Sequence, residues 1–318
     1  MGTWNILKKL FPLIGISIFI YLILKLDIKN ISQTILNANL GFLVIVILLV
    51  ILSVSLQTLK WWIIALNQEM NIPFKKAVKI NLMSDFYGFV TPSKLGTIMR
   101  VEYLKKYGTV GRGITNFTLD KILDICSLFF LSLLFIFVFK GIFPIYFRML
   151  MFGIVILIVL IFLFLKERAI LSILKWMYNN FLPKKFKLKA KSTFHALYEN
   201  FPKKSVLIQA LLLNTITWIV AYFISYFIGL SLGINVHWIY FLAIFPIATL
   251  IAQLPITVNG LGTREAVLIQ LFGLLNVEAT KVFSMSILGL LIAGIVPVMV
   301  GLFFILKGEN KKNEIHPI

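Results

Sequence analysis

The sequence is poor in charged residues and in cysteine, and it lacks the common nucleotide-binding and nucleophile motifs. Charged residues make up 14% of its 318 residues, whereas soluble domains have about 25%. The single cysteine, Cys126, excludes a disulfide bond within the chain. Neither a Walker P-loop nor a Gly-x-Ser-x-Gly motif is present, and the three histidines are scattered. We therefore expect no enzyme activity, no metal site and no cofactor.

Hydrophobic residues make up 60% of the chain and gather in runs long enough to cross a membrane. The stretch from Val206 to Thr263 contains no Asp, Glu, Lys or Arg. It is long enough for two crossings, because one crossing takes about 20 residues. Seven continuous spans are predicted, at Ile6–Leu26, Leu40–Leu66, Gly113–Phe139, Phe147–Leu165, Val206–Leu232, His237–Pro255 and Val282–Leu306. The sequence therefore predicts an all-α fold, a polytopic transmembrane helix bundle forming one membrane domain, 1–318.

Two long connections carry many of the basic residues and predict the orientation. Segments 67–112 and 166–204 hold eight and ten Lys and Arg residues, whereas 140–146 holds one and 233–236 holds none. By the positive-inside rule, we expect both basic segments and both termini to be cytoplasmic in a multi-pass protein of the cell membrane. This topology explains the net charge of +19 without nucleic acid as a partner. An even number of crossings follows, about eight, with one interrupted segment completing a crossing.

Two segments, Ile80–Leu104 and Ile256–Leu275, are apolar but interrupted by Pro, Gly and polar residues. Such segments are tolerated at membrane depth only when buried in protein or lining a cavity, so we expect them to be re-entrant. Each contains Leu-Gly-Thr a few residues after a proline, and each follows a long span. Paired interruptions of this kind are typical of a transporter's binding site. They predict two pseudo-repeated halves, at about 1–145 and 146–318.

A Pro or Gly break allows a helix to begin inside the membrane, with free backbone N–H groups at its N-terminus. With Arg100 and Arg264 close by, such a terminus would bind an anion, and a lipid phosphate is the anion expected at that depth. The alternative is that Gly260 and Gly262 serve close packing and that Arg264 and Glu265 form a structural pair. The candidate capping residues are Thr91, Ser93, Asn259 and Thr263.

Two carboxylates, Asp120 and Asp124, lie four residues apart and therefore on one face of the predicted third span. We expect this face to point inward, toward a polar cavity or toward Arg100 or Arg264. The carboxylates would then relay protons or hold the arginines in place, and the sequence does not separate these roles. Lys60, near the end of the second span, is expected to extend its ammonium group to the membrane surface.

These charged motifs resemble those of the flippase-like family that includes the transmembrane region of lysylphosphatidylglycerol synthases. Three elements match in order and spacing: Pro92, Gly96 and Arg100; Asp120, Lys121 and Asp124; and Pro255, Gly260, Gly262, Arg264 and Glu265. Two positions depart from the pattern: Thr97 stands where an acidic residue is common, and Asn259 replaces a glycine.

The resemblance implies translocation of a lipid or lipid-linked glycan, with anionic or phosphate-bearing membrane lipids as partners. The matched residues other than Pro255 are then the candidate substrate-binding residues. The alternative is a non-catalytic membrane subunit that supports a glycosyltransferase or lipid-modifying synthase, with that enzyme as its partner. A third reading, an intramembrane enzyme, rests on Asp120 and Asp124 alone. Only twelve residues follow Leu306, so we expect no separate aminoacyl-transferring domain.

Overall fold

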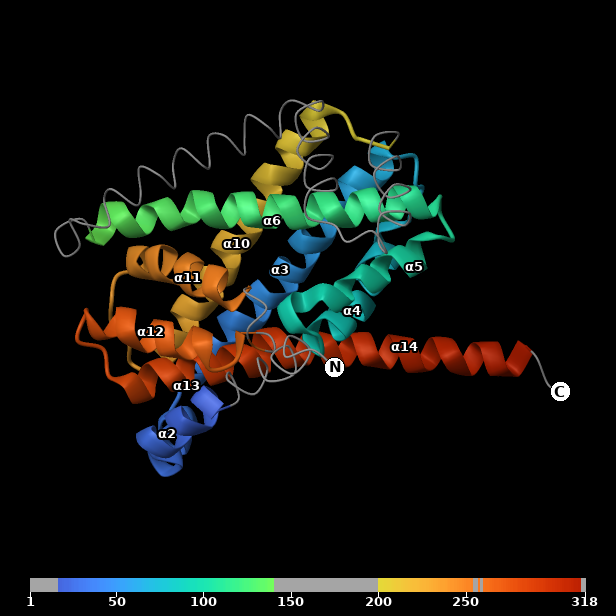
Figure 1. Ribbon diagram of the computed structural model, residues 1–318. Helices are drawn as coiled ribbons and strands as arrows, with labels where there is room; N and C mark the ends of the chain where they lie inside the picture. Colours follow the sequence, from blue (N-terminus) through green and yellow to red (C-terminus); the bar gives the residue numbers. More distant parts are fainter. Residues whose placement is uncertain (1–16, 140–199, 254–256, 258–259, 316–318) are drawn as a thin grey trace, which may run out of the picture.

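The computed structural model describes residues 17–139, 200–253, 257 and 260–315, and the regular secondary structure in these ranges is helical throughout (Figure 1). The elements, in chain order, are a helix at Ser17–Leu26, α2 (Ile28–Leu36), α3 (Leu40–Asn67), α4 (Phe74–Phe89), the 3-10 helix η1 (Pro92–Met99), α5 (Arg100–Leu104), α6 (Val110–Phe139), α10 (Lys204–Ser231), α11 (Trp238–Ala252), α12 (Thr263–Gly273), α13 (Ala279–Gly289), the π-helix η3 (Leu290–Ile295) and α14 (Val296–Ile315). The all-α prediction is confirmed.

Four of these helical stretches are long and apolar enough to cross a membrane: Leu40–Asn67, Val110–Phe139, Lys204–Ser231 and Ala279–Lys307. Each stretch coincides with a predicted span. Many large apolar side chains on them point outward, among them Leu48 and Ile51 of α3. A helix that is apolar all round and yet exposed is the arrangement expected in lipid, where no water competes for backbone hydrogen bonds. The chain is therefore a polytopic helical membrane protein.

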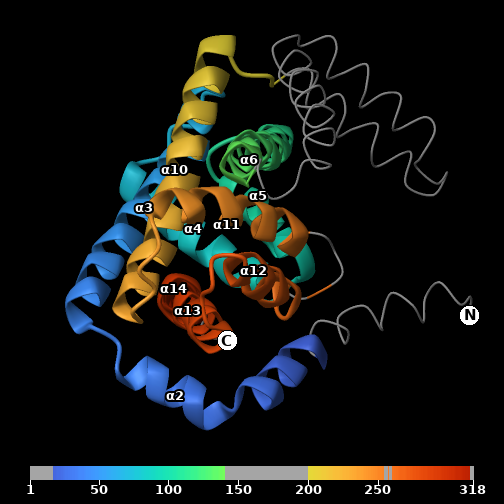
Figure 2. The same cartoon turned by 90° about the vertical axis from the view of Figure 1, so that its left-hand side faces the viewer.

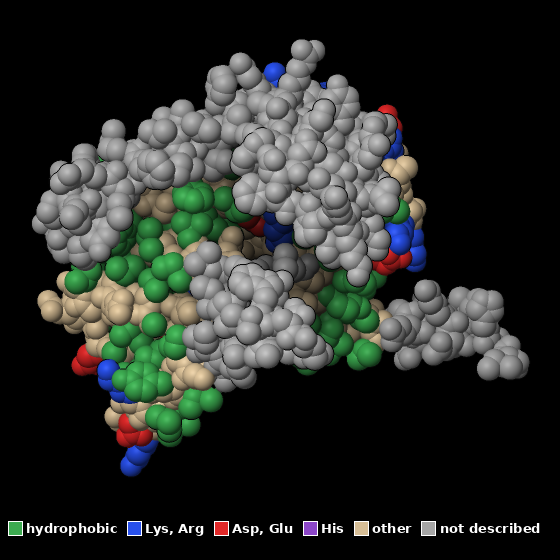
Figure 3. Space-filling model, viewed as in Figure 1, with side chains coloured by type: hydrophobic (Ala, Val, Ile, Leu, Met, Phe, Trp, Pro, Cys, Tyr) green, Lys and Arg blue, Asp and Glu red, His purple; other side chains and the backbone are tan. Residues whose placement is uncertain are grey.

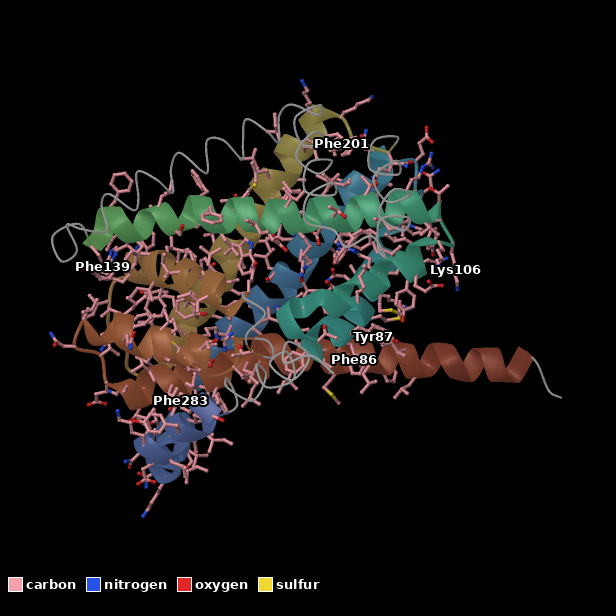
Figure 4. All side chains as sticks on the ribbon, in the orientation of Figure 1. Phe86, Tyr87, Lys106, Phe139, Phe201 and Phe283 are labelled. Carbon is pink, nitrogen blue, oxygen red and sulfur yellow. The ribbon has the colours of Figure 1, made fainter. Side chains whose placement is uncertain are left out.

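One end of the bundle is rich in basic residues, and we call it the basic rim. There the end of α3 meets the start of α10, because the Asn67 side chain accepts a hydrogen bond from the Lys203 backbone N–H at 2.8 Å. An ion pair of 2.6 Å joins Glu69, in the loop after α3, to Arg112 at the start of α6. Lys106 lies at the same end (Figure 4).

The other end, which we call the opposite rim, gathers the remaining helix ends. The backbone N–H of Asn39, just before α3, donates to the carbonyl of Ser231 at the end of α10 over 2.8 Å. The ring of Phe139, which ends α6, lies 5.8 Å from that of Tyr240 in α11. Helix α2 packs across this rim against α13, where Ile31 contacts the cluster around Phe283 (Figure 2).

Both interrupted segments return to the rim from which they start. The α4–η1–α5 hairpin begins and ends at the basic rim, between the loops that carry Glu69 and Arg112. The α11–α12 hairpin begins and ends at the opposite rim, since Gly233–Val236 and Leu275–Lys281 line one recess there. The predicted re-entrant character of Ile80–Leu104 is thus borne out. The second hairpin forms from Ile256–Leu275 only together with α11, so the prediction of a crossing span at His237–Pro255 is wrong: its helix, Trp238–Ala252, is too short to cross. The two hairpins enter from opposite sides. The expectation that one of them completes a crossing is wrong.

Several predictions fall on residues outside the described ranges. These include the predicted span Phe147–Leu165, the first part of Ile6–Leu26, Pro255 and Asn259. The total of about eight crossings depends on these spans, so it stays a prediction. The proposed boundary between two halves, at about residue 145, also lies outside the described part of the chain and stays a prediction.

Candidate functional site

Helix α6 runs across α10 and α3 and brings both predicted carboxylates to buried cations (Figure 1). Asp120 lies 2.6 Å from the Arg100 guanidinium and 2.7 Å from the Lys60 ammonium. Asp124, one turn further along, lies 2.9 Å from the same ammonium. The inward face predicted for the two carboxylates is confirmed, and Arg100 is one of the partners that the sequence suggested. Arg264 is not among their ion-pair partners in the described residues.

Lys60 is the central cation of this site, and its sequence-based interpretation is wrong. Its side chain is only 3% exposed, so the ammonium does not extend to the membrane surface. Besides the two carboxylates it donates to the Oδ1 atom of Asn214, in α10, at 2.8 Å. A charged residue inside a transmembrane helix is costly unless it is paired. The position of Lys60 within the predicted second span therefore already indicated a buried, paired cation. No comparable signal marked Asn214.

The Asn214 amide is fixed so that its oxygen faces Lys60. Its Nδ2 atom donates to the Leu123 carbonyl at 2.8 Å and to the Ser127 hydroxyl at 2.9 Å. Both acceptors lie on α6, so Asn214 joins α10 to α6. Because each of its polar atoms is satisfied, this buried amide contributes an oriented dipole without a desolvation penalty.

The Arg100 guanidinium lies between aromatic rings as well as against a carboxylate. Its Cζ atom is 4.9 Å from the ring centre of Trp61 and 6.0 Å from that of Phe117, distances at which a cation interacts with an aromatic face. The side chain is 4% exposed. Its Nε–H group has no hydrogen-bond partner among the described residues.

Helix α4 reaches the same region through a chain of polar side chains. The Trp61 indole donates to Asn81 at 3.1 Å, and the Asn81 amide donates to Asp85 at 2.9 Å. Asp85, which lies within the first interrupted segment, was not among the candidate site residues. It interacts electrostatically with Lys94, Arg100 and other charges of the site.

The first interrupted segment turns back tightly at its proline. Thr91, one of the two predicted capping residues, is the N-cap of η1 but makes no capping hydrogen bond through its side chain. Its hydroxyl instead accepts the Gly96 backbone N–H at 2.7 Å, which closes the turn. A side chain at Gly96 would overlap the carbonyl of Tyr87 in the last turns of α4. Glycine is therefore required here for the close approach of η1 to α4.

In the second interrupted segment, the positive charge of Arg264 is neutralised by the neighbouring Glu265. Gly262, not Thr263, caps α12, and its N–H donates to a carboxylate oxygen of Glu265 at 2.6 Å. Arg264 donates to the other oxygen at 3.0 Å, and Ser286 of α13 donates to that oxygen at 2.7 Å. The helix N-terminus predicted to bind an anion thus holds Glu265. The structural pairing of Arg264 with Glu265, weighed as the alternative, is present.

Gly260 also has a conformational role. Its φ of +76° lies in the left-handed region, and a side chain there would overlap Ala252 at the end of α11. Close packing, the second part of that alternative, therefore applies at Gly260.

The two interrupted segments share one electrostatic environment on α6. Lys94, in the first segment, lies within long-range electrostatic reach of Lys121 and Asp124 of α6 and of Arg264 in the second segment. Unlike the buried groups, Lys121 and Arg264 keep 34% and 26% of their side chains exposed. In Figure 3, a few basic and acidic atoms are visible near the middle of this face, away from the charged rims.

We call this set the charge cluster. Its members are Lys60, Asp85, Lys94, Arg100, Asp120, Lys121, Asp124, Arg264 and Glu265. Within the described ranges, no group of three or more His, Cys, Asp or Glu side chains is placed to hold a metal ion. The chemistry that the cluster offers is the binding of a charged group by accessible cations.

Comparison with known proteins agrees with the order and spacing of these motifs. Residues 12–301 match the family described as the lysylphosphatidylglycerol synthase TM region. A relative, the UPF0104 membrane protein PH1989 of Pyrococcus horikoshii, is 24% identical over 335 residues, covering 95% of this chain and 98% of the relative. The resemblance inferred from the motifs is confirmed. The chain belongs to the family of the lysylphosphatidylglycerol synthase transmembrane region.

Proposed function

We propose that the chain translocates a lipid with a phosphate-bearing headgroup, a phospholipid or a lipid-linked glycan, between the two leaflets. The observation that carries the proposal is the arrangement of the two re-entrant hairpins. They enter from opposite rims, and their cations Lys94 and Arg264 share one electrostatic environment against α6. Paired broken helices in the two parts of a bundle are a common way in which membrane transporters build a substrate site.

The accessible cations of the cluster are suited to phosphate. Lys121 and Arg264 keep part of their side chains exposed, and Lys94 is exposed as well. Arginine binds phosphate through two parallel N–H groups, and lysine adds a compact positive charge. A headgroup at this site would exchange water for these donors while its acyl chains stay in lipid.

The proposal includes an orientation in the cell membrane. The basic rim carries Lys105, Lys106 and Arg112, and the positive-inside rule assigns such a rim to the cytoplasm. The α4–η1–α5 hairpin would then enter from the cytoplasmic side, and the α11–α12 hairpin from the outer side.

We further propose that the chain is not an enzyme. Asp120 and Asp124, the only basis for an intramembrane reaction, are both bound to Lys60, and Asp120 is also bound to Arg100. Both carboxylates are therefore engaged in ion pairs that join helices, which is a structural use of the two groups.

Reconstitution tests the proposal directly. Purified protein in liposomes containing acyl-labelled phospholipids or a polyprenyl-phosphate lipid is expected to move label between leaflets. Arg264→Ala is expected to reduce the rate at least about tenfold, since it removes a phosphate donor and leaves Glu265 without its cation. Arg264→Lys keeps the charge and should retain part of the rate.

Lys281→Gln provides the matched control, because Lys281 is similarly exposed, at 36%, but lies at the opposite rim. Absence of translocation for every lipid, or full activity in Arg264→Ala, would refute the proposal. A membrane enzyme that co-purifies with the chain, and loses activity without it, would instead support the accessory-subunit role.

A further inference from the structure

We infer that Trp218 and Tyr222, two residues of α10, form a second contact for the headgroup by donating hydrogen bonds to its phosphate oxygens. The inference rests on the proposed function and adds a site between the charge cluster and the opposite rim. It is carried by the course of α10 through the bundle and by two buried donors on that helix.

The ion pairs on α6 lie closer to the basic rim than to the opposite rim. Asn214, which binds Lys60, is nearer to the start of α10 at Lys204 than to its end at Ser231. At 1.5 Å per residue, about 25 Å of α10 separates Asn214 from that end. A headgroup that leaves these charges toward the opposite rim needs further hydrogen-bonding partners on the way, because unpaired polar groups are costly where water is scarce.

Trp218 and Tyr222 continue the face of α10 that carries Asn214. The three residues are spaced four apart, so their side chains lie on one side of the helix. The Asn214 amide donates to α6, and the Tyr222 ring lies 5.9 Å from that of Phe245 in α11. The Trp218 and Tyr222 rings stack on one another at 5.9 Å. This face of α10 is therefore turned toward α6 and α11, inside the bundle.

Both side chains end in a buried donor without an acceptor. The indole Nε1–H of Trp218 and the hydroxyl of Tyr222 make no hydrogen bond within the described part of the chain, and Tyr222 is only 2% exposed. The indoles of Trp61 and Trp62, by contrast, donate to a side-chain amide and to a backbone carbonyl. Buried donors are nearly always paired in native proteins. Two unpaired ones a single turn apart therefore indicate an acceptor that comes from outside the chain.

Thr249 of α11 lies close to the Tyr222 hydroxyl but does not supply this acceptor in the structure. Its hydroxyl donates to the Phe245 carbonyl at 2.7 Å, and its oxygen is not at hydrogen-bond geometry with Tyr222. Tyr222 therefore keeps its donor free for a ligand.

Neutral donors suit a headgroup in transit. Indole and phenol groups donate to phosphate oxygens without adding a charge. One such hydrogen bond changes affinity by about two- to tenfold, whereas the cations of the charge cluster bind an anion more strongly. A site along a transport path has to bind strongly enough for entry and weakly enough for release. Trp218 and Tyr222 meet that requirement on the side of Asn214 that faces the opposite rim.

Infrared difference spectroscopy measures the proposed contact directly. Spectra of the purified protein are compared with and without dioleoylphosphatidylethanolamine or a polyprenyl phosphate, and at least one of these lipids is expected to shift the C–O stretching band of a tyrosine. Tyr222→Phe should abolish the shift. Tyr240→Phe, the matched control, removes a tyrosine hydroxyl from α11 near the opposite rim and should keep it. Dioleoylglycerol, which has acyl chains and no phosphate, should not produce the shift.

Translocation and stability provide two further readouts. Tyr222→Phe and Trp218→Phe are each expected to slow translocation about two- to tenfold, since each removes one hydrogen bond. Without added lipid, Tyr222→Phe should unfold at the same temperature as the wild type or higher, because it deletes a buried hydroxyl that has no partner. A merely structural hydroxyl would lower that temperature instead.

The outcomes separate the two proposals. A wild type that shows the lipid-dependent shift but moves no lipid would refute only the proposed function. A band that neither lipid shifts would identify water or Thr249 as the partner of Tyr222 and overturn the inference, as would a shift retained in Tyr222→Phe or an unchanged translocation rate in both variants. Inorganic phosphate distinguishes a lipid from a soluble anion: a band that phosphate alone leaves in place supports the lipid headgroup, and a band that it shifts overturns it.

Discussion

Replacing Lys60 by Met tests whether the buried ion pairs hold the bundle together. The substitution removes three contacts of 2.7–2.9 Å, to Asp120, Asp124 and Asn214, while conserving much of the side-chain volume. Removing one partner of a buried ion pair costs about 3–5 kcal/mol, because the remaining charge is left without compensation. Asp120 keeps Arg100 in the variant, so we expect the lower end, a loss of about 3 kcal/mol in the free energy of unfolding.

A double mutant separates lost pairing from lost packing. Asp124→Asn removes the carboxylate that Lys60→Met leaves with only Lys121, at 3.7 Å. The double variant is therefore expected to be more stable than Lys60→Met alone by about 1 kcal/mol or more, through a favourable coupling between the two changes. If the loss came from packing, the second change would add to the first.

The chain provides its own probe for this measurement. Cys126 is the single cysteine and is buried, so a thiol-reactive fluorophore reports unfolding in detergent without any engineered label. Lys281→Met, at the opposite rim, is the control and should change stability by less than about 0.5 kcal/mol. A loss below about 1 kcal/mol in Lys60→Met, with the control unchanged, would refute the assignment of Lys60 as a paired, buried cation.

Three further predictions concern the hairpins. Gly96→Ala should destabilise the protein by about 1–3 kcal/mol in the same thiol assay, because η1 would have to move away from α4, whereas Gly273→Ala, in open space, should not. Glu265→Gln should lower stability by about 1.5–3 kcal/mol, since it replaces charge-assisted hydrogen bonds, and an unchanged unfolding midpoint would contradict that role. In a Cys-free background, an impermeant thiol reagent should label cysteines at Asn276 and Lys106 from opposite sides of the membrane; labelling from one side would contradict the assignment of the rims.

Much of the bundle could be predicted because crossing a membrane imposes a local rule on composition. A run of about 20 apolar residues is visible without any knowledge of its neighbours, and the four long helical stretches were found in this way. The prediction that His237–Pro255 crosses the membrane was wrong for a physical reason, because the helix formed there, α11, is short. Its 15 residues span about 22 Å at 1.5 Å per residue, too short for a hydrocarbon layer of about 30 Å, and the following apolar residues concealed its end.

The buried partners were harder to predict because they depend on contacts between distant parts of the chain. Lys60 and Asn214 are 154 residues apart, and nothing in either span states that they meet. The pairing of Arg100 with Asp120 could be predicted, because charged residues are rare in the apolar segments and each therefore has few possible partners. The sequence therefore identified the charged elements of the site and missed the cation and the amide that complete it.

The two arginines that match in sequence are not equivalent in the structure. Arg100 is 4% exposed and is neutralised by Asp120 from another helix, so it ties the first hairpin to α6. Arg264 is 26% exposed and is neutralised by the adjacent Glu265 within its own hairpin. A movement of the first hairpin relative to α6 would separate the buried ion pair of Arg100 and Asp120. A movement of the second hairpin would leave the ion pair of Arg264 and Glu265 intact, because both residues belong to that hairpin. If the proposed function holds, Arg264, the more exposed of the two arginines, is the one expected to meet a headgroup, whereas Arg100 joins the first hairpin to α6.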